Sequence, residues 1–360
     1  MHLGHATRAV TLATDLAVKC PVADAPHRSA LDELCPSGLY PAIAAAHADS
    51  IAEKTILTEL VSDKLSLPPD STLVAFGSLA REEWSSGSDL DWVLLVDGQV
   101  SPAHFSAMLK AQRELEHLAP GATGTFGGLV FSHQLVHLIG GQDDSNRNLT
   151  LRMLLLLESV ALGQPPTQAY DRVLNALLSR YLIEPSSFSQ KKLTPRFLLN
   201  DLIRYWRTLG VDFADKFHDQ AGKKAVLRNV KLRFSRKLIY TAGLYSCLRW
   251  YETQPQPNAS ETLDHFRHLA TTPPLEIIAQ ACLDQDASPT TREAIFTNYE
   301  IFLLALRDKR EELEQLPPGQ AAADPLFNHL RDASHPFENA LMDLLAAKNL
   351  GSQLVRYAIF

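Results

Sequence analysis

The spacing of apolar positions changes twice along the chain and divides it into three regions. In the first region, apolar residues recur at roughly helical spacing within Ala-rich stretches that contain few helix breakers. Two short apolar runs follow, at residues 73–76 and 92–96, and each has the length of a strand. Helical spacing then returns. This order predicts an α+β fold in which a small mixed sheet precedes a larger all-helical domain. The predicted boundaries are an amino-terminal helical region over 1–63, a sheet-containing core over 64–148 and a helical domain over 149–360.

The predicted core alternates strands with helices. Between the two apolar runs, residues 79–84 predict one polar turn of helix and residues 85–88 predict a loop. A Ser-Pro pair favours a helix start at residue 101, and this helix is expected to run to about residue 118. Residues 124–138 predict a third strand region. The helices expected after the core cover residues 150–161, 169–182, 195–209, 223–249, 261–270, 275–283, 290–316 and 336–350, with a loop over 317–335.

Two acidic residues stand at the start of the second apolar run. Asp89 and Asp91 are two positions apart, and residues with this spacing in a strand point to the same face. Their carboxylates are therefore expected to meet at one point. Gly77 and Ser78, which follow the first run, would lie beside them on the neighbouring strand and offer backbone N–H groups to an anion. Carboxylates that bind Mg²⁺ next to a turn that binds phosphate are what a nucleoside triphosphate requires.

The order and spacing of these residues resemble the signature of the DNA polymerase β-like nucleotidyltransferase superfamily. The form Gly-Ser-x-x-Arg, followed by Ser-Asp-x-Asp, is most similar to the bacterial regulatory branch, such as PII uridylyltransferase and glutamine-synthetase adenylyltransferase. The resemblance implies that Asp89 and Asp91 are catalytic and hold Mg²⁺ or Mn²⁺. It also implies transfer of a nucleoside monophosphate from a nucleoside triphosphate, ATP or UTP, to a hydroxyl of a protein or RNA acceptor. The residues implied to contact the nucleotide within the motif are Gly77, Ser78, Arg81 and Ser88.

The sequence departs from this family at the third metal ligand. Most members carry a third carboxylate on the third core strand, but residues 127–136 contain no acid. Asp144, which follows a Gly-Gly pair, is the predicted third ligand, and Asp143 and Glu158 are the other nearby acids. Two alternatives stay open. The site could work with two carboxylates and water, or the protein could be a non-catalytic nucleotide-sensing regulator that keeps the metal-nucleotide site.

A basic block in the helical half is a second candidate for phosphate contacts. Residues 191–237 contain 13 Lys or Arg against four Asp, an excess of +9, which leaves the rest of the chain at −16. Such a block suits a phosphate-bearing partner, although a solvated basic helix pair would look the same. By similarity to superfamily members whose second domain brings a Lys and a Ser to the triphosphate tail, Lys231 and Ser235 are predicted nucleotide contacts. On one helix they would share a face with Lys224 and Arg228.

The composition adds constraints on the class of protein. The four cysteines show neither a paired C-x-x-C spacing nor zinc spacing, which is typical of reduced thiols in the cytoplasm. A signal peptide is not expected, and an 18-residue apolar window is absent from the sequence, so no contact with a membrane is predicted. The sequence contains no RNA-recognition motif with paired aromatics, and the basic block alone does not distinguish RNA from a triphosphate. The acceptor therefore stays open between protein and RNA.

Overall fold

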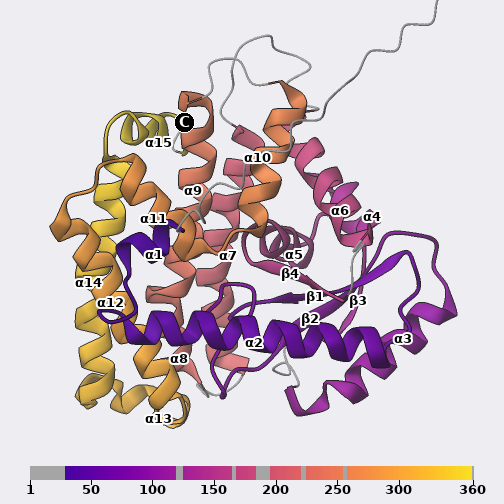
Figure 1. Cartoon of the computed structure of the whole chain (residues 1–360), viewed down its shortest axis with the longest axis horizontal. Helices are drawn as coiled ribbons and strands as arrows, with labels where there is room; N and C mark the ends of the chain where they lie inside the picture. The colour runs from indigo at the N-terminus through magenta and orange to yellow at the C-terminus, as the bar shows by residue number, and fades with distance from the viewer. Residues whose placement is uncertain are drawn as a thin grey trace, which may run out of the picture.

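The computed structural model describes residues 29–118, 125–163, 168–183, 195–219, 224–253 and 258–358 (Figure 1). Its sheet has four strands in the order β3-β2-β1-β4. Strand β1 is antiparallel to both β2 and β4, whereas β2 and β3 are parallel. The strands are β1 (Ser71–Phe76), β2 (Asp91–Val96), β3 (Gly128–Phe131) and β4 (Ser159–Leu162). The sheet is mixed and a largely helical region follows it, so the predicted α+β fold is confirmed.

Helices account for most of the remaining described residues. Two lie before the sheet: α1 (Ala30–Leu34) and α2 (Pro41–Lys64). Three lie between or beside its strands: α3 (Pro102–Glu114), α4 (Ser132–Val136) and α5 (Asn146–Leu157). The rest follow it: α6 (Gln168–Leu178), α7 (Arg196–Asp219), α8 (Ala225–Arg233), α9 (Ser235–Thr253), α10 (Ala259–Thr271), α11 (Pro274–Asp284), α12 (Pro289–Asp308), α13 (Arg310–Gln315), α14 (Pro325–Ala346) and α15 (Leu350–Ala358). Within the described ranges, no helix is both long enough and apolar enough to cross a membrane.

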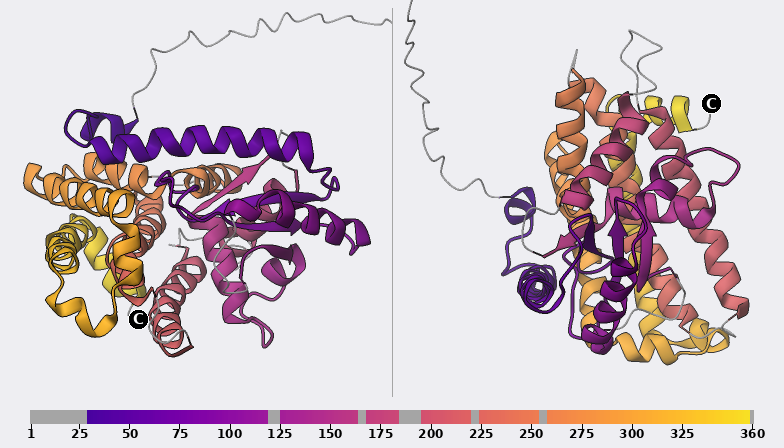
Figure 2. Two further views of the ribbon diagram at one scale, coloured as in Figure 1. Left: turned by 90° about the horizontal axis from the view of Figure 1, so that it is seen from below. Right: turned by 90° about the vertical axis from the view of Figure 1, so that its right-hand side faces the viewer.

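The sheet is covered on both faces. Alternate residues of a strand point to opposite sides, so neighbouring residues of β1 and β2 enter different cores. Leu73 and Leu94 pack in one cluster with α2 and α3, whereas Val74 and Leu95 join the larger cluster that extends into α5, α6 and the later helices. Figure 2 shows α2 lying along one side of the sheet, with α12 packed against α2 beyond the sheet. All six residues of β1 are buried, which explains why four of them in succession, residues 73–76, are apolar.

Carboxylates from the later helices hold the amino-terminal helices in place. The two oxygens of Glu276 on α11 accept hydrogen bonds from the backbone N–H groups of Ala30 and Leu31 at the start of α1. Glu300 on α12 does the same for Ala42 and Ile43 at the start of α2. Each glutamate satisfies two N–H groups that have no partner within their own helix and places a negative charge at a positive helix end.

Several predicted elements differ in the structure. A hydrogen-bonded turn over residues 77–82 replaces the helical turn predicted over 79–84, and the predicted third strand region gives only the short β3 before α4 begins. The predicted helix over 150–161 ends at Leu157, and β4 takes the remainder. A Leu-rich run is buried on all sides, so its spacing does not separate a helix from a strand. Strand β4 lies beyond residue 148, so the sheet extends past the predicted core, and the prediction for residues 1–28 lies outside the described residues.

The helix boundaries in the carboxyl-terminal half also differ from the predicted ones, and buried packing explains two of the differences. Helix α7 continues through Gly210, and the basic stretch divides at Phe234, whose ring is fully buried and stacks on Phe302 with ring centroids 4.8 Å apart. The predicted helix over 290–316 divides at Lys309 into α12 and α13. Helix α14 begins at Pro325 rather than at residue 336 and carries Pro336 inside it. Its buried residues continue on both sides of Pro336, so tertiary packing outweighs the lost backbone hydrogen bond.

Candidate functional site

The turn after β1 lies directly against the start of β2. The strand register pairs Phe76 with Asp91, so Gly77 is the first residue of the turn beside that carboxylate. Gly77 has a φ of +70°, and a Cβ atom added there would lie 3.0 Å from Asp91 Oδ2. Both its backbone conformation and the close approach therefore require glycine. The turn closes through hydrogen bonds from Arg81 N to the Gly77 carbonyl (3.0 Å) and from Glu83 N to the Ser78 carbonyl (2.8 Å).

Gly77→Ala is expected to cost stability and also to displace the Asp91 carboxylate. Gly140→Ala is the matched control, because Gly140 has a φ of +69° but nothing within 4 Å of its added Cβ. Both variants should lose about 1–2 kcal/mol of unfolding free energy from the left-handed backbone conformation. Only Gly77→Ala should also weaken binding of a nucleoside triphosphate. Urea unfolding and calorimetric titration measure the two effects, and equal nucleotide affinities in both variants would contradict this role for Gly77.

The two carboxylates of the motif have different surroundings. The Asp89 side chain is 39% exposed and accepts a hydrogen bond from Arg310 Nη2 at 2.8 Å. Burial tends to raise its pKa, but this hydrogen bond and the charges of Lys231 and Arg310 leave the pKa lowered. Burial, with the charge of Asp89 next, raises the pKa of Asp91 to about 6. The pair therefore carries an unfavourable like-charge interaction that a bound cation would relieve.

A group of cations surrounds Asp89 and Asp91. Lys231 on α8 is partly buried, and burial followed by the charge of Arg310 lowers its pKa to about 8, against the opposing effect of Asp89. Arg236 on α9 lowers the pKa of Asp91, as does Lys231. The elements after the sheet thus supply positive charge to the motif that the first two strands present. Such a concentration of cations suits a polyphosphate.

Arg81 belongs to the turn, and its side chain is only 6% exposed. Its Nε donates to Glu83 Oε2 at 2.7 Å, and its Nη1 donates to Glu158 Oε2. Glu158, immediately before β4, also accepts a hydrogen bond from Arg236 Nη1 at 2.5 Å. Tyr299 on α12 donates to the other oxygen of Glu83. Arg81 thus connects the turn to the residue before β4 and, through Glu83, to α12. Its contact with a nucleotide stays a prediction, and these hydrogen bonds do not favour it.

The three serines predicted to contact the nucleotide differ in burial and in hydrogen bonding. Ser78 is partly buried in the turn, next to Gly77. Ser88 is buried, and its Oγ accepts a hydrogen bond from Ser85 N at 3.1 Å, so it shapes the loop before Asp89. Ser235 is 1% exposed, and its Oγ donates to the Lys231 carbonyl at 3.2 Å. Because the helix breaks at Phe234, Ser235 and Lys231 do not lie on one continuous helical face, contrary to the prediction.

Asp144 has its own partner in the structure. Its two oxygens accept hydrogen bonds from Arg152 Nη1 and Nη2 at 2.7 and 2.8 Å, and Arg152 is fully buried. Its predicted role as a metal ligand therefore stays a prediction that these contacts do not favour. Glu158 is the further acid whose charge raises the pKa of Asp91, but Arg81 and Arg236 hold it. In the part of the chain that the structure describes, no group of three or more His, Cys, Asp or Glu residues could hold a metal ion.

The residues present fit a hard divalent cation in one respect. Asp89 and Asp91 offer carboxylate oxygens of the kind that Mg²⁺ prefers, and their mutual repulsion favours a shared cation. Water or a bound phosphate would have to complete the coordination. Arg310 competes for Asp89, because its guanidinium already bonds to that carboxylate.

Residues 54–120 match the family model described as nucleotidyltransferase domain. The match contains the Gly77 turn, both carboxylates of the motif, strands β1 and β2, and α3. This part of the chain is therefore similar to a polymerase β-like nucleotidyltransferase domain, in agreement with the family suggested by its motif. No curated protein matches the chain.

Proposed function

We propose that the chain is a divalent-metal-dependent nucleotidyltransferase. It transfers a nucleoside monophosphate from ATP or UTP to a hydroxyl of a protein or RNA acceptor, in a regulatory role. The observation that carries this proposal is the position of Asp91, whose carboxylate lies against the Gly77 turn and next to Asp89. The match of residues 54–120 to a nucleotidyltransferase domain supports it.

In this proposal, some residues bind the metal ion and others bind the phosphates. Asp89 and Asp91 would hold Mg²⁺ or Mn²⁺, and the chemistry that this ion supplies when bound is polarisation of phosphate oxygens. Gly77 and Ser78 would receive the phosphates at the turn, and Lys231 would offset their charge. Arg310 would leave Asp89 for the phosphates when the metal binds. A fixed set of donors of this kind lowers the barrier mainly by positioning and by stabilising the departing pyrophosphate.

The direct test is incubation of the purified protein with each α-³²P-labelled nucleoside triphosphate, Mg²⁺ and a fractionated cell extract. We expect one triphosphate to label a macromolecule in the protein or the RNA fraction. Asp91→Asn, assayed in parallel, should give no label. Equal labelling by wild type and Asp91→Asn would place the chemistry elsewhere, and transfer of label from γ-³²P nucleotide alone would indicate a kinase.

The second candidate is a nucleotide sensor without transfer activity. Two observations favour it: Glu158 is held by two arginines, and Arg310 occupies one oxygen of Asp89. A sensor would bind Mg-nucleotide saturably and release it unchanged. Tight binding with no labelled product in any extract fraction would therefore replace the first proposal with this one.

A further inference from the structure

The last residue of the Gly77 turn is held from outside by α2. One carboxylate oxygen of Glu82 lies 2.7 Å from His47 Nδ1, and the other accepts a hydrogen bond from Lys54 Nζ at 2.8 Å. Both cationic side chains belong to α2. The Glu82 side chain is 17% exposed and that of Lys54 is 20% exposed, so this ion pair is screened less than a surface pair. Two side chains of α2 therefore hold one carboxylate of the turn.

The two residues that follow Glu82 are bonded to other helices as well. Glu83 accepts a hydrogen bond from the Tyr299 hydroxyl of α12. The backbone N–H of Trp84 donates to Ser50 Oγ of α2 at 2.9 Å, and the Ser50 side chain is fully buried. Three successive residues at the end of the turn thus have partners on α2 or α12.

The backbone at Glu82 needs such support. Its φ is +61°, in the left-handed region, which a residue with a side chain occupies at a cost. The neighbouring residues close the turn, because Arg81 N donates to the Gly77 carbonyl and Glu83 N to the Ser78 carbonyl. A strained residue of this kind persists only where the surrounding structure holds it, and such residues are concentrated at functional sites. A change of conformation at Glu82 would open the turn that presents Gly77 and Ser78.

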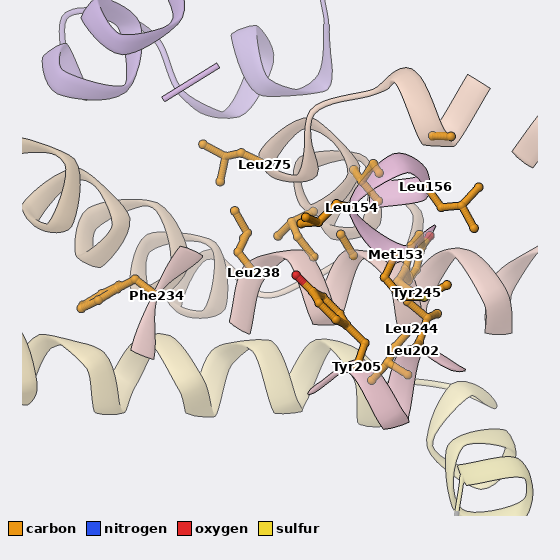
Figure 3. Packing of buried hydrophobic residues seen from close by; sticks show 14 of the residues in the cluster. Met153, Leu154, Leu156, Leu202, Tyr205, Phe234, Leu238, Leu244, Tyr245 and Leu275 are labelled. Carbon is orange, nitrogen blue, oxygen red and sulfur yellow. The ribbon is translucent and has the colours of Figure 1, made fainter. Parts of the chain in front are cut away.

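Helix α12 keeps these supports in place. Tyr299 packs against Phe302 and Phe337, with ring centroids 5.3 and 5.6 Å away. Both of those rings pack against Phe234, a residue of the main hydrophobic core (Figure 3). The next residue, Glu300, caps the start of α2. Two adjacent residues of α12 therefore fix the end of the turn and the helix that holds Glu82.

We propose that Lys54 and His47 are positioning residues, which act through Glu82 to fix the turn in the conformation that receives the phosphates. The proposal rests on the proposed function, because that function assigns the phosphates to Gly77 and Ser78. Neither cationic side chain touches the nucleotide in this role. When the binding-competent conformation is only partly populated, the apparent affinity falls by that fraction. Loss of support at Glu82 should therefore weaken polyphosphate binding.

Glu82→Met and Glu82→Gly separate the conformation of this residue from its charge. Both remove the carboxylate and its two contacts with α2, but only glycine adopts the left-handed conformation without a steric cost. Each protein is titrated calorimetrically, in the presence of Mg²⁺, with the α,β-methylene analogues of ATP and UTP and with inorganic tripolyphosphate. Glu82→Met should weaken binding by about fivefold or more, whereas Glu82→Gly should stay within about twofold of the wild type.

A direct effect of the Glu82 charge on the phosphates predicts a different result. Each variant removes one negative charge near the turn, so both would then bind polyphosphate more tightly and to a similar extent. That result would overturn the positioning role. A purely structural role would lower the melting temperature of Glu82→Met without changing its affinity, and it would overturn the proposal as well.

The cations of α2 provide an independent test, which carries the proposal if circular dichroism shows that Glu82→Met does not fold. The double variant His47→Gln/Lys54→Met should weaken binding by about three- to tenfold, but by less than about twofold when Glu82→Gly is also present. Lys64→Met is the matched control, because Lys64 also lies on α2 but pairs with Glu114 of α3 at 3.4 Å. It should leave binding unchanged. Equal weakening with and without Glu82→Gly would show that the cations act on the phosphates directly, and the proposal would be wrong.

The outcomes also separate this proposal from the proposed function. If the wild type binds the analogues and tripolyphosphate but no variant of Glu82, His47 or Lys54 changes the affinity, the positioning role alone is wrong. If the wild type binds none of these ligands, the proposed function fails, and the positioning role fails with it.

Discussion

Asp91→Asn is expected to abolish nucleotide transfer while leaving the chain folded. The carboxylate lies against Gly77 and shares its surroundings with Asp89, so the substitution removes one of the two negative charges available to the metal. Loss of metal-assisted charge stabilisation should lower the rate by on the order of a hundredfold or more. The rate of label transfer from the α-³²P nucleotide measures this, with circular dichroism as the check on folding.

The same variant should be more stable than the wild type at neutral pH. The folded state raises the pKa of Asp91 to about 6, from an ordinary value near 4, so it retains this proton where the unfolded chain has lost it. Stability contributed by this group is therefore lost as pH rises from about 4 to about 6. Asp91→Asn should match the wild type near pH 4 and exceed it above about pH 6, by about 1–3 kcal/mol.

Asp89→Asn is the control for this pH dependence because the pKa of Asp89 is shifted in the opposite direction. Arg310 and Lys231 stabilise its charged form, so this variant should lose stability at neutral pH and approach the wild type as the carboxylate becomes protonated. Melting temperatures measured between about pH 2 and pH 8 compare the three proteins, because Asp89 becomes protonated only below its ordinary pKa. A change of the same sign in both variants would contradict the electrostatic account of the pair.

Arg81→Met is expected to be among the most destabilising single substitutions near the motif. The guanidinium is buried between Glu83 and Glu158, and its removal leaves their buried negative charge poorly compensated. Breaking a buried ion cluster in this way costs about 3–5 kcal/mol. Urea unfolding should therefore give a much lower midpoint.

An exposed ion pair provides the comparison for Arg81. Arg172 donates to Asp97 at 2.6 Å, but its side chain is 47% exposed, so Arg172→Met should cost no more than about 1 kcal/mol. The double variant Arg81→Met/Glu83→Gln should recover part of the loss, because one buried carboxylate no longer carries charge. Similar losses for Arg81→Met and Arg172→Met would show that the buried cluster does not hold the turn in place.

The sequence predicts the part of the fold in which local pattern and packing agree. Each of the first two strands contains a continuous apolar run, and these runs are bounded by Gly77 and by Asp91, so the end of β1 and the start of β2 can be predicted without a structure. Strand β4 was not predicted, because the Leu-rich segment before it is almost entirely buried and only the non-helical backbone at Glu158 separates helix from strand. The break at Phe234 depends on its packing against Phe302, a contact between distant parts of the chain.

In the candidate site, residues close together in the sequence could be predicted, whereas residues brought in from distant segments could not. Asp89, Asp91 and Gly77 could be identified because strand periodicity brings them together within one short segment. Arg310 could not, because it is 221 residues from Asp89 and its own helix shows only an ordinary charged surface. The prediction for Asp144 relied on the nearby Gly-Gly pair. The sequence does not show that Arg152 is buried and donates hydrogen bonds to both oxygens of Asp144.

The glutamates at the starts of α1 and α2 have a consequence for how the chain is made. Glu276 lies 246 residues after Ala30, and Glu300 lies 258 residues after Ala42. During synthesis the two amino-terminal helices must therefore exist without these caps until α11 and α12 have left the ribosome. Contacts of such long sequence separation carry a large entropic cost of closure and form late. The Gly77 turn and the two carboxylates are thus translated well before the helices α11 and α12 that complete the packing around α1 and α2.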